Sequence, residues 1–124
     1  GLRPTKQRIK ICKVLFDRKK TFHFTINYLK ILLREKTDQK VSQATVYNTI
    51  NALRKKGHLK EISINSEKNY FDTNISSHHH FFNESTQELI DLHDSDIGKI
   101  NIKNPLPGKK IKSIEVLVKV ANSN

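Results

Sequence analysis

The sequence lacks residues on which several classes of protein depend. It has no tryptophan, no methionine and a single cysteine, Cys12. One cysteine excludes a disulfide framework within the chain, and it excludes any zinc site of the Cys-x-x-Cys type. Because Cys12 falls at the apolar spacing of its segment, we expect it to be a small buried hydrophobe rather than a redox thiol.

Long apolar runs are also absent. No stretch approaches the roughly 20 apolar residues of a membrane span. No signal-peptide pattern opens the chain, and its first residue is not methionine, so we expect a removed start residue or a missing leading segment. These absences favour a cytoplasmic protein with no membrane partner.

Acidic residues are scarce relative to basic ones. The 124 residues include 23 Lys+Arg and 12 Asp+Glu, which gives a formal net charge of +11. The whole excess lies in residues 1–75, which hold 17 basic and 6 acidic residues, whereas residues 76–124 hold 6 of each. We therefore predict a polyanion as the partner of the first part and a domain boundary near residue 75. A generically basic protein is the simpler alternative.

Three helices are predicted in the basic half. Residues 5–16 and 25–35 repeat apolar side chains at helical spacing behind a threonine that can cap each helix. Residues 42–56 begin at the cap Ser42 and end before Gly57. This third helix has a narrow apolar seam. Its opposite face carries small, amide, phenol and cationic groups but no carboxylate: Ala44, Tyr47, Asn48, Asn51 and Lys55.

The order of the predicted elements indicates an α+β fold. A hairpin over 58–72 follows the three helices, which is the layout of a winged helix whose third helix enters the DNA major groove. Residues 76–124 consist of short predicted strands, including "HHHFF", "QELIDLHD" and 111–121. Such short strands bury little surface alone. We therefore predict an N-terminal winged-helix DNA-binding domain, 1–75, and a small, mostly strand α/β domain for dimerisation and ligand sensing, 76–124.

The motifs "LRPTKQR", "SQATVYNTINALRKKG", "YFDT" and "HHHFF" resemble those of the ferric uptake regulator family of bacterial metal-dependent repressors. The run "YFDTN…HHHFF" and the short turn region 94–108 are most similar to the family's haem-linked iron response regulator branch. The resemblance implies a homodimeric regulator of iron or haem homeostasis that binds an A/T-rich, pseudo-palindromic operator in double-stranded DNA. No pattern for catalysis stands out, so we expect neither an enzyme nor a nucleotide cofactor.

Candidate DNA contacts come from the resemblance and from the residues themselves. The resemblance implies that Tyr47 contacts thymine methyls and that Arg3 reaches an A/T-rich minor groove. It places neighbouring contacts at Ser42, Ala44, Thr45 and Asn48. From the residues alone, the amides of Asn48 and Asn51 suit adenine edges, and a helix start suits phosphate. The candidates at that start are Thr5, Gln7 and Arg8. A packed Tyr47 and a solvated Arg3 are the alternatives.

Three adjacent histidines are the other candidate site. Because successive strand side chains point to opposite faces, His78 and His80 would share one face and His79 the other. The resemblance implies that His79 joins His23 and Asp72 in a regulatory metal site. It implies that His78 and His80 belong to a second metal site.

Both metal sites look incomplete by this resemblance. Phe81 stands where the first site has another histidine, and Gly98 and Ser113 stand where the second has ligands. Glu84 and His93 are the candidates to compensate for the ligand that the first site lacks. We therefore favour haem held by His78, His79 or His80 beside two phenylalanines. The alternatives are a co-repressor ion, Fe(II), Mn(II) or Zn(II), a haem- or metal-handling protein with incidental basic charge, and a polar strand edge.

Overall fold

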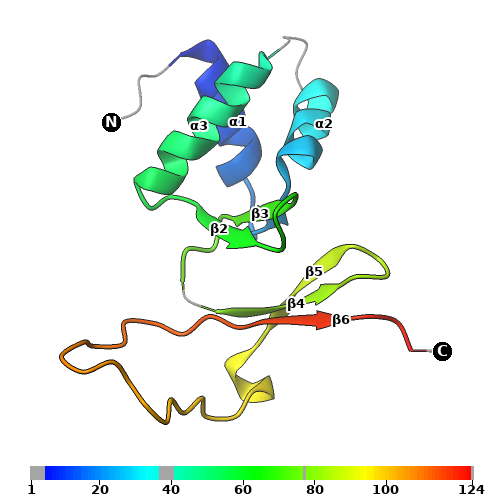
Figure 1. Ribbon diagram of the computed structural model, residues 1–124. Coiled ribbons are helices and arrows are strands. Elements are labelled where there is room, and N and C mark those ends of the chain that lie inside the picture. Colours follow the sequence, from blue (N-terminus) through cyan, green and yellow to red (C-terminus); the bar gives the residue numbers. More distant parts are fainter. Residues whose placement is uncertain (1–4, 37–40, 77, 124) are drawn as a thin grey trace. The chain divides into compact units, whose positions relative to one another are not determined.

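The computed structural model describes residues 5–36, 41–76 and 78–123. The chain divides into two compact units, residues 1–75 and residues 76–124. The first unit carries three helices and a small sheet, and the second carries a sheet, a short 3-10 turn and a long stretch without regular structure (Figure 1). The α+β fold with an N-terminal winged helix and a mostly strand second domain is confirmed. Arg3 lies outside the described residues.

The helices of the first unit begin where their capping residues predict. Helix α1 spans Lys6–Phe16, and the Thr5 hydroxyl accepts the Arg8 backbone N–H at 3.2 Å. Helix α2 spans Ile26–Lys36, and α3 spans Gln43–Lys55 behind the cap Ser42. Each cap satisfies one of the donors that a helix start leaves unpaired.

Helix α3 ends as its glycine predicts. Gly57 has φ +83° and lies just past the helix, where a left-handed residue lets the chain turn back. The His58 backbone N–H donates to the Leu53 carbonyl at 2.9 Å, which satisfies one of the last carbonyls of the helix. This turn leads directly into the hairpin.

The core of the first unit packs the inner faces of all three helices against the sheet. Its fully buried members include Ile11, Leu29 and Ile50, one from each helix, together with Phe24 and Leu15. Cys12 is half-buried beside this core, so the prediction of a buried thiol holds only in part.

A three-stranded antiparallel sheet completes the winged helix. The predicted hairpin is present as β2, Lys60–Ser63, and β3, Asn69–Asp72. The third strand, β1, His23–Phe24, was not predicted; it pairs with β3 and makes the order β1-β3-β2. This pairing sets His23 directly opposite Asp72.

The second unit is built on a sheet of order β5-β4-β6. Strand β4, His79–Asn83, and strand β5, Glu88–Leu92, form an antiparallel hairpin, and β6, Leu117–Val120, runs parallel to β4. The 3-10 turn η1, Asp94–Asp96, follows β5. Both strands predicted in "HHHFF" and "QELIDLHD" are therefore confirmed.

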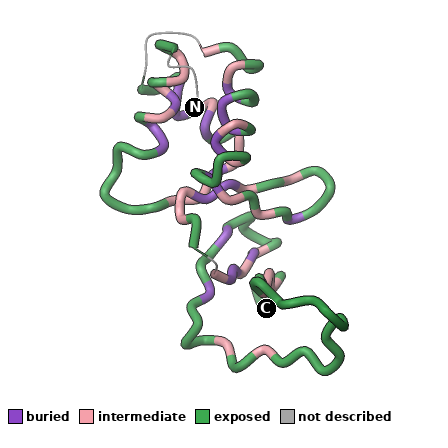
Figure 2. Tube along the Cα trace, turned by 90° about the vertical axis from the view of Figure 1, so that its left-hand side faces the viewer, coloured by how far each residue is buried: buried purple, intermediate pink, exposed green. Residues whose placement is uncertain are grey.

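The third predicted strand of the second half, 111–121, was too long. Only Leu117–Val120 pairs with β4, while residues 97–116 have no helix or strand. Figure 2 shows that this stretch is mostly exposed. Alternating apolar residues need a partner strand to become a strand, and β4 is only five residues long.

Candidate functional site

The outward face of α3 gathers half of the predicted DNA contacts. Val46, Ile50 and Leu53 are buried against the core, which turns the opposite side of the helix toward solvent. The phenol of Tyr47 is 47% exposed, a high value for a large aromatic side chain. Beside it, the face carries three exposed residues and one half-buried residue: Ala44, Asn48 and Asn51, with Thr45.

Two cations flank this face of α3. The Lys30 Nζ of α2 lies 5.4 Å from the centroid of the Tyr47 ring. The Arg54 Nη2 donates to the Asn51 Oδ1 at 2.9 Å, and its Nε lies 3.9 Å from the Glu61 Oε2 on β2. The carbonyl oxygen of Asn51 therefore already accepts a hydrogen bond, so pairing with both polar atoms of an adenine edge requires a second bond to that oxygen.

The predicted phosphate contacts lie at helix starts. Thr5 is the N-cap of α1, and Ser42 is the N-cap of α3, where its hydroxyl accepts the Thr45 backbone N–H at 3.2 Å. Gln7 and Arg8 are half-buried in the first turn of α1. None of the three helices has an acidic residue in its first turn, so these helix starts keep their positive potential.

The three histidines divide as strand alternation predicts. The rings of His78 and His80 lie side by side, with centroids 4.3 Å apart. The Nε2 atoms of both lie 3.5 Å from the Oδ1 of Asp91, the residue opposite His80 on β5. The ligand atoms of all three residues lie within 4.8 Å of one another. We call these three residues the His–Asp cluster.

Strand alternation predicts the two histidines of the His–Asp cluster but not its carboxylate. The hairpin register supplies the missing signal: a tight turn over 84–87 pairs His80 with Asp91 on one face of the sheet. The Nδ1 of His78 lies 2.8 Å from the Ser76 carbonyl oxygen, which leaves Nε2 as the nitrogen that faces Asp91. Two imidazoles and one carboxylate are donors that divalent transition metals accept.

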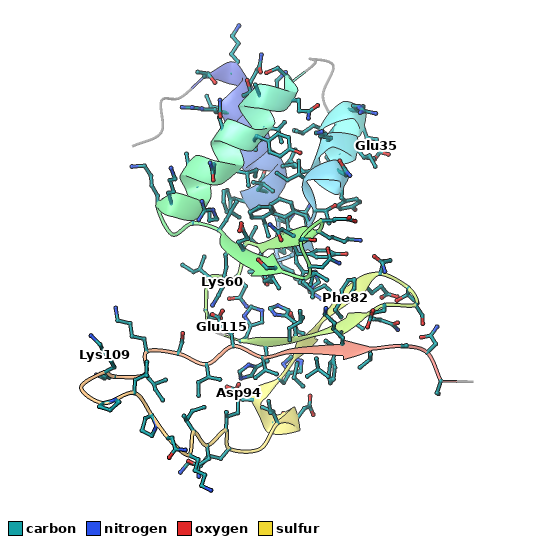
Figure 3. The ribbon with its side chains drawn as sticks, in the orientation of Figure 1. Glu35, Lys60, Phe82, Asp94, Lys109 and Glu115 are labelled. Carbon is teal, nitrogen blue, oxygen red and sulfur yellow. The ribbon has the colours of Figure 1, made fainter. Side chains whose placement is uncertain are left out.

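His79 lies on the other face of β4 and makes different contacts. Its Nδ1 accepts the Val116 backbone N–H at 2.9 Å, and its Nε2 lies 3.9 Å from the Oδ1 of Asp94 in η1, labelled in Figure 3. A neutral imidazole has one acceptor nitrogen, and Val116 occupies it. Coordination of a metal through Nε2 would therefore require His79 to release Val116 or to lose a second proton.

The remaining predicted metal ligands belong to the first unit. His23 and Asp72 face one another across β1 and β3, and Asp72 is only 2% exposed. The Asp72 Oδ1 accepts the Asn74 backbone N–H at 2.9 Å. A site shared by these residues and His79 spans both units, and it stays a prediction.

The candidate replacement ligands, and the residues that stand where the family's ligands are expected, do not converge on one point. Glu84 is exposed after β4, and His93 is exposed at the start of η1. Gly98 and Ser113 are exposed in the stretch without regular structure, and Phe81 is half-buried in β4. Among the described residues, the His–Asp cluster is the group of histidine and carboxylate ligands that converges within the second unit.

The three helices and hairpin of the first unit form a winged helix, and the strand unit that follows carries the clustered histidines. The chain belongs to the Ferric uptake regulator family, whose sequence profile matches residues 1–119. The recognition of this family from its motifs is confirmed. Members of the family are regulators of transcription rather than enzymes.

Individual relatives agree with this assignment. The chain is 27% identical over 100 residues to the peroxide-responsive repressor PerR of Staphylococcus epidermidis, a match that covers 81% of this chain and 65% of the repressor. The chain thus spans less than two thirds of that relative's length.

Two solved structures share the fold. The ferric uptake regulator of Francisella tularensis, solved with iron, superposes with a TM-score of 0.76 at 15% identity, over 98% of this chain and 92% of that one. The ferric uptake regulator of Pseudomonas aeruginosa, solved with manganese, gives 0.73 at 19% identity, over 100% and 92%. Within the described part of the chain, no helix is long and apolar enough to cross a membrane.

Proposed function

We propose that this chain is a homodimeric transcriptional regulator that reads operator DNA with α3 and senses a divalent metal ion at the His–Asp cluster. The observation that carries the sensing role is the convergence of two imidazole Nε2 atoms, each 3.5 Å from one oxygen of Asp91. A regulator of this kind acts on DNA in the cytoplasm.

The DNA-binding role rests on charge and on the composition of the α3 face. The first unit carries the whole net positive charge of the chain, and duplex DNA presents dense phosphate charge. The exposed face of α3 offers a phenol and amides without a carboxylate that would repel the backbone. Apolar contact with a thymine methyl and amide bonds to base edges are the direct readout such a face supports.

The donor chemistry of the His–Asp cluster fits a small divalent ion. Imidazole nitrogen and carboxylate oxygen suit Zn(II), Mn(II) and Fe(II), and three protein ligands leave positions open for water or a further ligand. A bound ion would link His78 and His80, at the start of β4, to Asp91 of β5, and so hold the hairpin in one arrangement. The iron and the manganese in the two related structures support an ion of this class.

Haem, which the sequence favoured, gains no support from the described residues or from the relatives. Two axial imidazoles flank a haem iron from opposite faces of the macrocycle. The rings of His78 and His80 instead lie side by side on one face of a strand, 4.3 Å apart, and His80 is only 4% exposed. This arrangement suits one small ion better than a porphyrin.

A second copy of the chain is the proposed partner of the second unit. Among its described apolar residues only Phe82, Leu89 and Leu92 are buried, which is a thin core for a separate unit. The stretch 97–116 also exposes Ile102, Leu106 and Ile111. A two-fold pair that covers these residues would give the two α3 helices the symmetry that a pseudo-palindromic operator requires.

A metal ion can regulate DNA binding only if the affinity for the operator differs between the metal-bound and the metal-free protein. If the ion changes operator affinity by some factor, the operator must change the metal affinity by the same factor. The metal therefore regulates DNA binding to the extent that it binds the DNA-bound arrangement and the free arrangement differently.

Selection of bound sequences from random duplex DNA tests the proposal. It is run with the apo protein, with Zn(II), with Mn(II), with Fe(II) under anaerobic conditions, and with haem. We expect an A/T-rich, two-fold symmetric site whose enrichment depends on the divalent ion. Enrichment of no sequence under any condition would overturn the DNA-binding role, and dependence on haem alone would replace the metal by haem.

A further inference from the structure

Lys30 of α2 lies against the aromatic face of the side chain that dominates the reading surface. Its Nζ is 5.4 Å from the centroid of the Tyr47 ring, within the roughly 6 Å over which a cation and an aromatic ring attract. The two residues belong to different helices of one compact unit, so the contact joins α2 to the exposed face of α3.

Two neighbours of Tyr47 on the exposed face of α3 offer its ring little to pack against. One turn before it, Ala44 offers only a methyl group, and one turn after it, Asn51 is engaged with Arg54 at 2.9 Å. With almost half of its surface exposed, the phenol would otherwise sample several rotamers. The ammonium of Lys30 is the group positioned to favour one of them.

We propose that Lys30 is a positioning and specificity residue: it holds the Tyr47 ring in the orientation that contacts a thymine methyl in the major groove. This inference rests on the DNA-binding role proposed above. The cation occupies one face of the ring and leaves the opposite face and the edge to the base. An ordered ring loses less conformational freedom when it binds, so the contact gains in affinity and in selectivity.

A general role as a phosphate contact is the competing explanation, and it makes a different prediction. A lysine that only neutralises phosphate strengthens binding to every sequence alike. A lysine that positions Tyr47 affects the difference between thymine and a base that lacks the methyl group. Uracil is that base, because it keeps every polar group of thymine and lacks only the methyl.

The test compares two duplexes, the selected operator and the same operator with deoxyuridine in place of each thymine contacted in the major groove. For the unmodified chain we expect each such replacement to weaken binding about fourfold, as the loss of one buried methyl implies. Lys30→Met should reduce this ratio toward one. Lys30→Arg should retain it, because a guanidinium also stacks on aromatic rings.

Two further variants provide controls. Lys36→Met removes the same charge from the exposed end of the same helix and should keep the ratio measured for the unmodified chain. In a Tyr47→Ala background the ratio should already be near one, and the addition of Lys30→Met should not change it. Circular dichroism and thermal melting verify the fold, and Lys30→Gln serves as the second variant if Lys30→Met fails to fold.

The outcomes separate this inference from the proposed function. If the unmodified chain binds the operator but Lys30→Met keeps the full thymine-to-uracil ratio, or weakens both duplexes equally, the inference is overturned and DNA binding stands. If the unmodified chain does not distinguish the two duplexes, the methyl contact is absent and the inference also fails. If it binds no duplex at all, the proposed function fails.

Discussion

His80 and Asp91 face one another across the β4–β5 hairpin, with the histidine Nε2 3.5 Å from the aspartate Oδ1. The two residues are direct partners in the antiparallel register, so the spacing of the hairpin sets their approach. His78 reaches the same carboxylate oxygen from just before β4. A short, local hairpin thus brings together most of the ligands of the proposed metal site from adjacent strands.

Asp91→Asn should weaken divalent metal binding to the second unit. The substitution keeps the shape of the side chain and removes its charge, so the two imidazoles lose the anionic ligand. Loss of an outer-shell partner alone costs about 10–100-fold in metal affinity, and we expect at least that for a ligand. Isothermal titration with Zn(II) or Mn(II) measures the change. Asp96→Asn, in the 3-10 turn, is the matched control, and an equal loss in both variants would contradict the role of Asp91.

The sequence predicted the first unit better than the second because its signals there are local. Caps, helical spacing and a glycine at φ +83° fix α1, α2 and α3 without reference to distant residues. Strand β1 was missed because two residues carry no periodicity, and only pairing with β3 makes them a strand. The segment 111–121 alternated well, but pairing with β4 limits the strand to four residues.

The His–Asp cluster was likewise predictable only where its signals are local. Alternation along a strand predicted that His78 and His80 share a face, and the rings do lie together. The choice of Asp91 as their partner depends on the turn and register of the hairpin, which the residues themselves do not specify. The hydrogen bond from the Val116 backbone to His79 likewise joins residues 37 positions apart, beyond the reach of any local pattern.

Tyr47→Ala should lower affinity for the selected operator while Tyr28→Ala should not. The two tyrosines are almost equally exposed, at 47% and 48%, and both lie in the first unit, but only Tyr47 is on the α3 face. Aromatic contact with bases is worth about 1–3 kcal/mol, so we expect a loss of about 5- to 150-fold for Tyr47→Ala. Fluorescence anisotropy with a labelled duplex measures it. Equal losses in the two variants would show that the α3 face has no special part in binding.

Leu29→Ala should destabilise the first unit strongly, whereas Ile31→Ala should change its stability little. Both residues lie on α2, but Leu29 is fully buried in the core and Ile31 is 47% exposed. A buried leucine truncated to alanine costs about 2–5 kcal/mol, while an exposed position changes stability by less than about 0.5 kcal/mol. Urea denaturation followed by circular dichroism compares the two variants. Similar midpoints would mean that α2 does not pack as described.

The Cys12 thiol should react slowly with alkylating reagents at mildly alkaline pH. Burial raises the pKa of this thiol, and the nearby Arg8 opposes only part of the rise. The thiolate is the reactive form, so fewer molecules are reactive at a given pH than in the unfolded chain. Because the folded pKa is the higher one, stability should fall as pH rises through the unfolded value toward the folded value.

Iodoacetamide labelling at pH 8, with and without guanidinium, measures the effect on Cys12. We expect faster modification in the denaturant, where the thiol regains its ordinary pKa. The loss of stability above pH 9 should be smaller in Cys12→Ala. Equal labelling rates in the folded and unfolded chains would contradict the raised pKa.

A bound metal ion should raise the stability of the second unit, whose buried apolar core is small. An ion that binds only the folded arrangement adds RT ln(1 + [L]/Kd), about 2.7 kcal/mol at 100 times Kd. The ion would link His78 to Asp91 and so oppose separation of β4 from β5. Differential scanning calorimetry with Zn(II) or Mn(II) should show a rise in the melting transition that Asp91→Asn abolishes and Asp96→Asn keeps. A shift of the same size in Asp91→Asn would place the stabilising ion elsewhere in the chain.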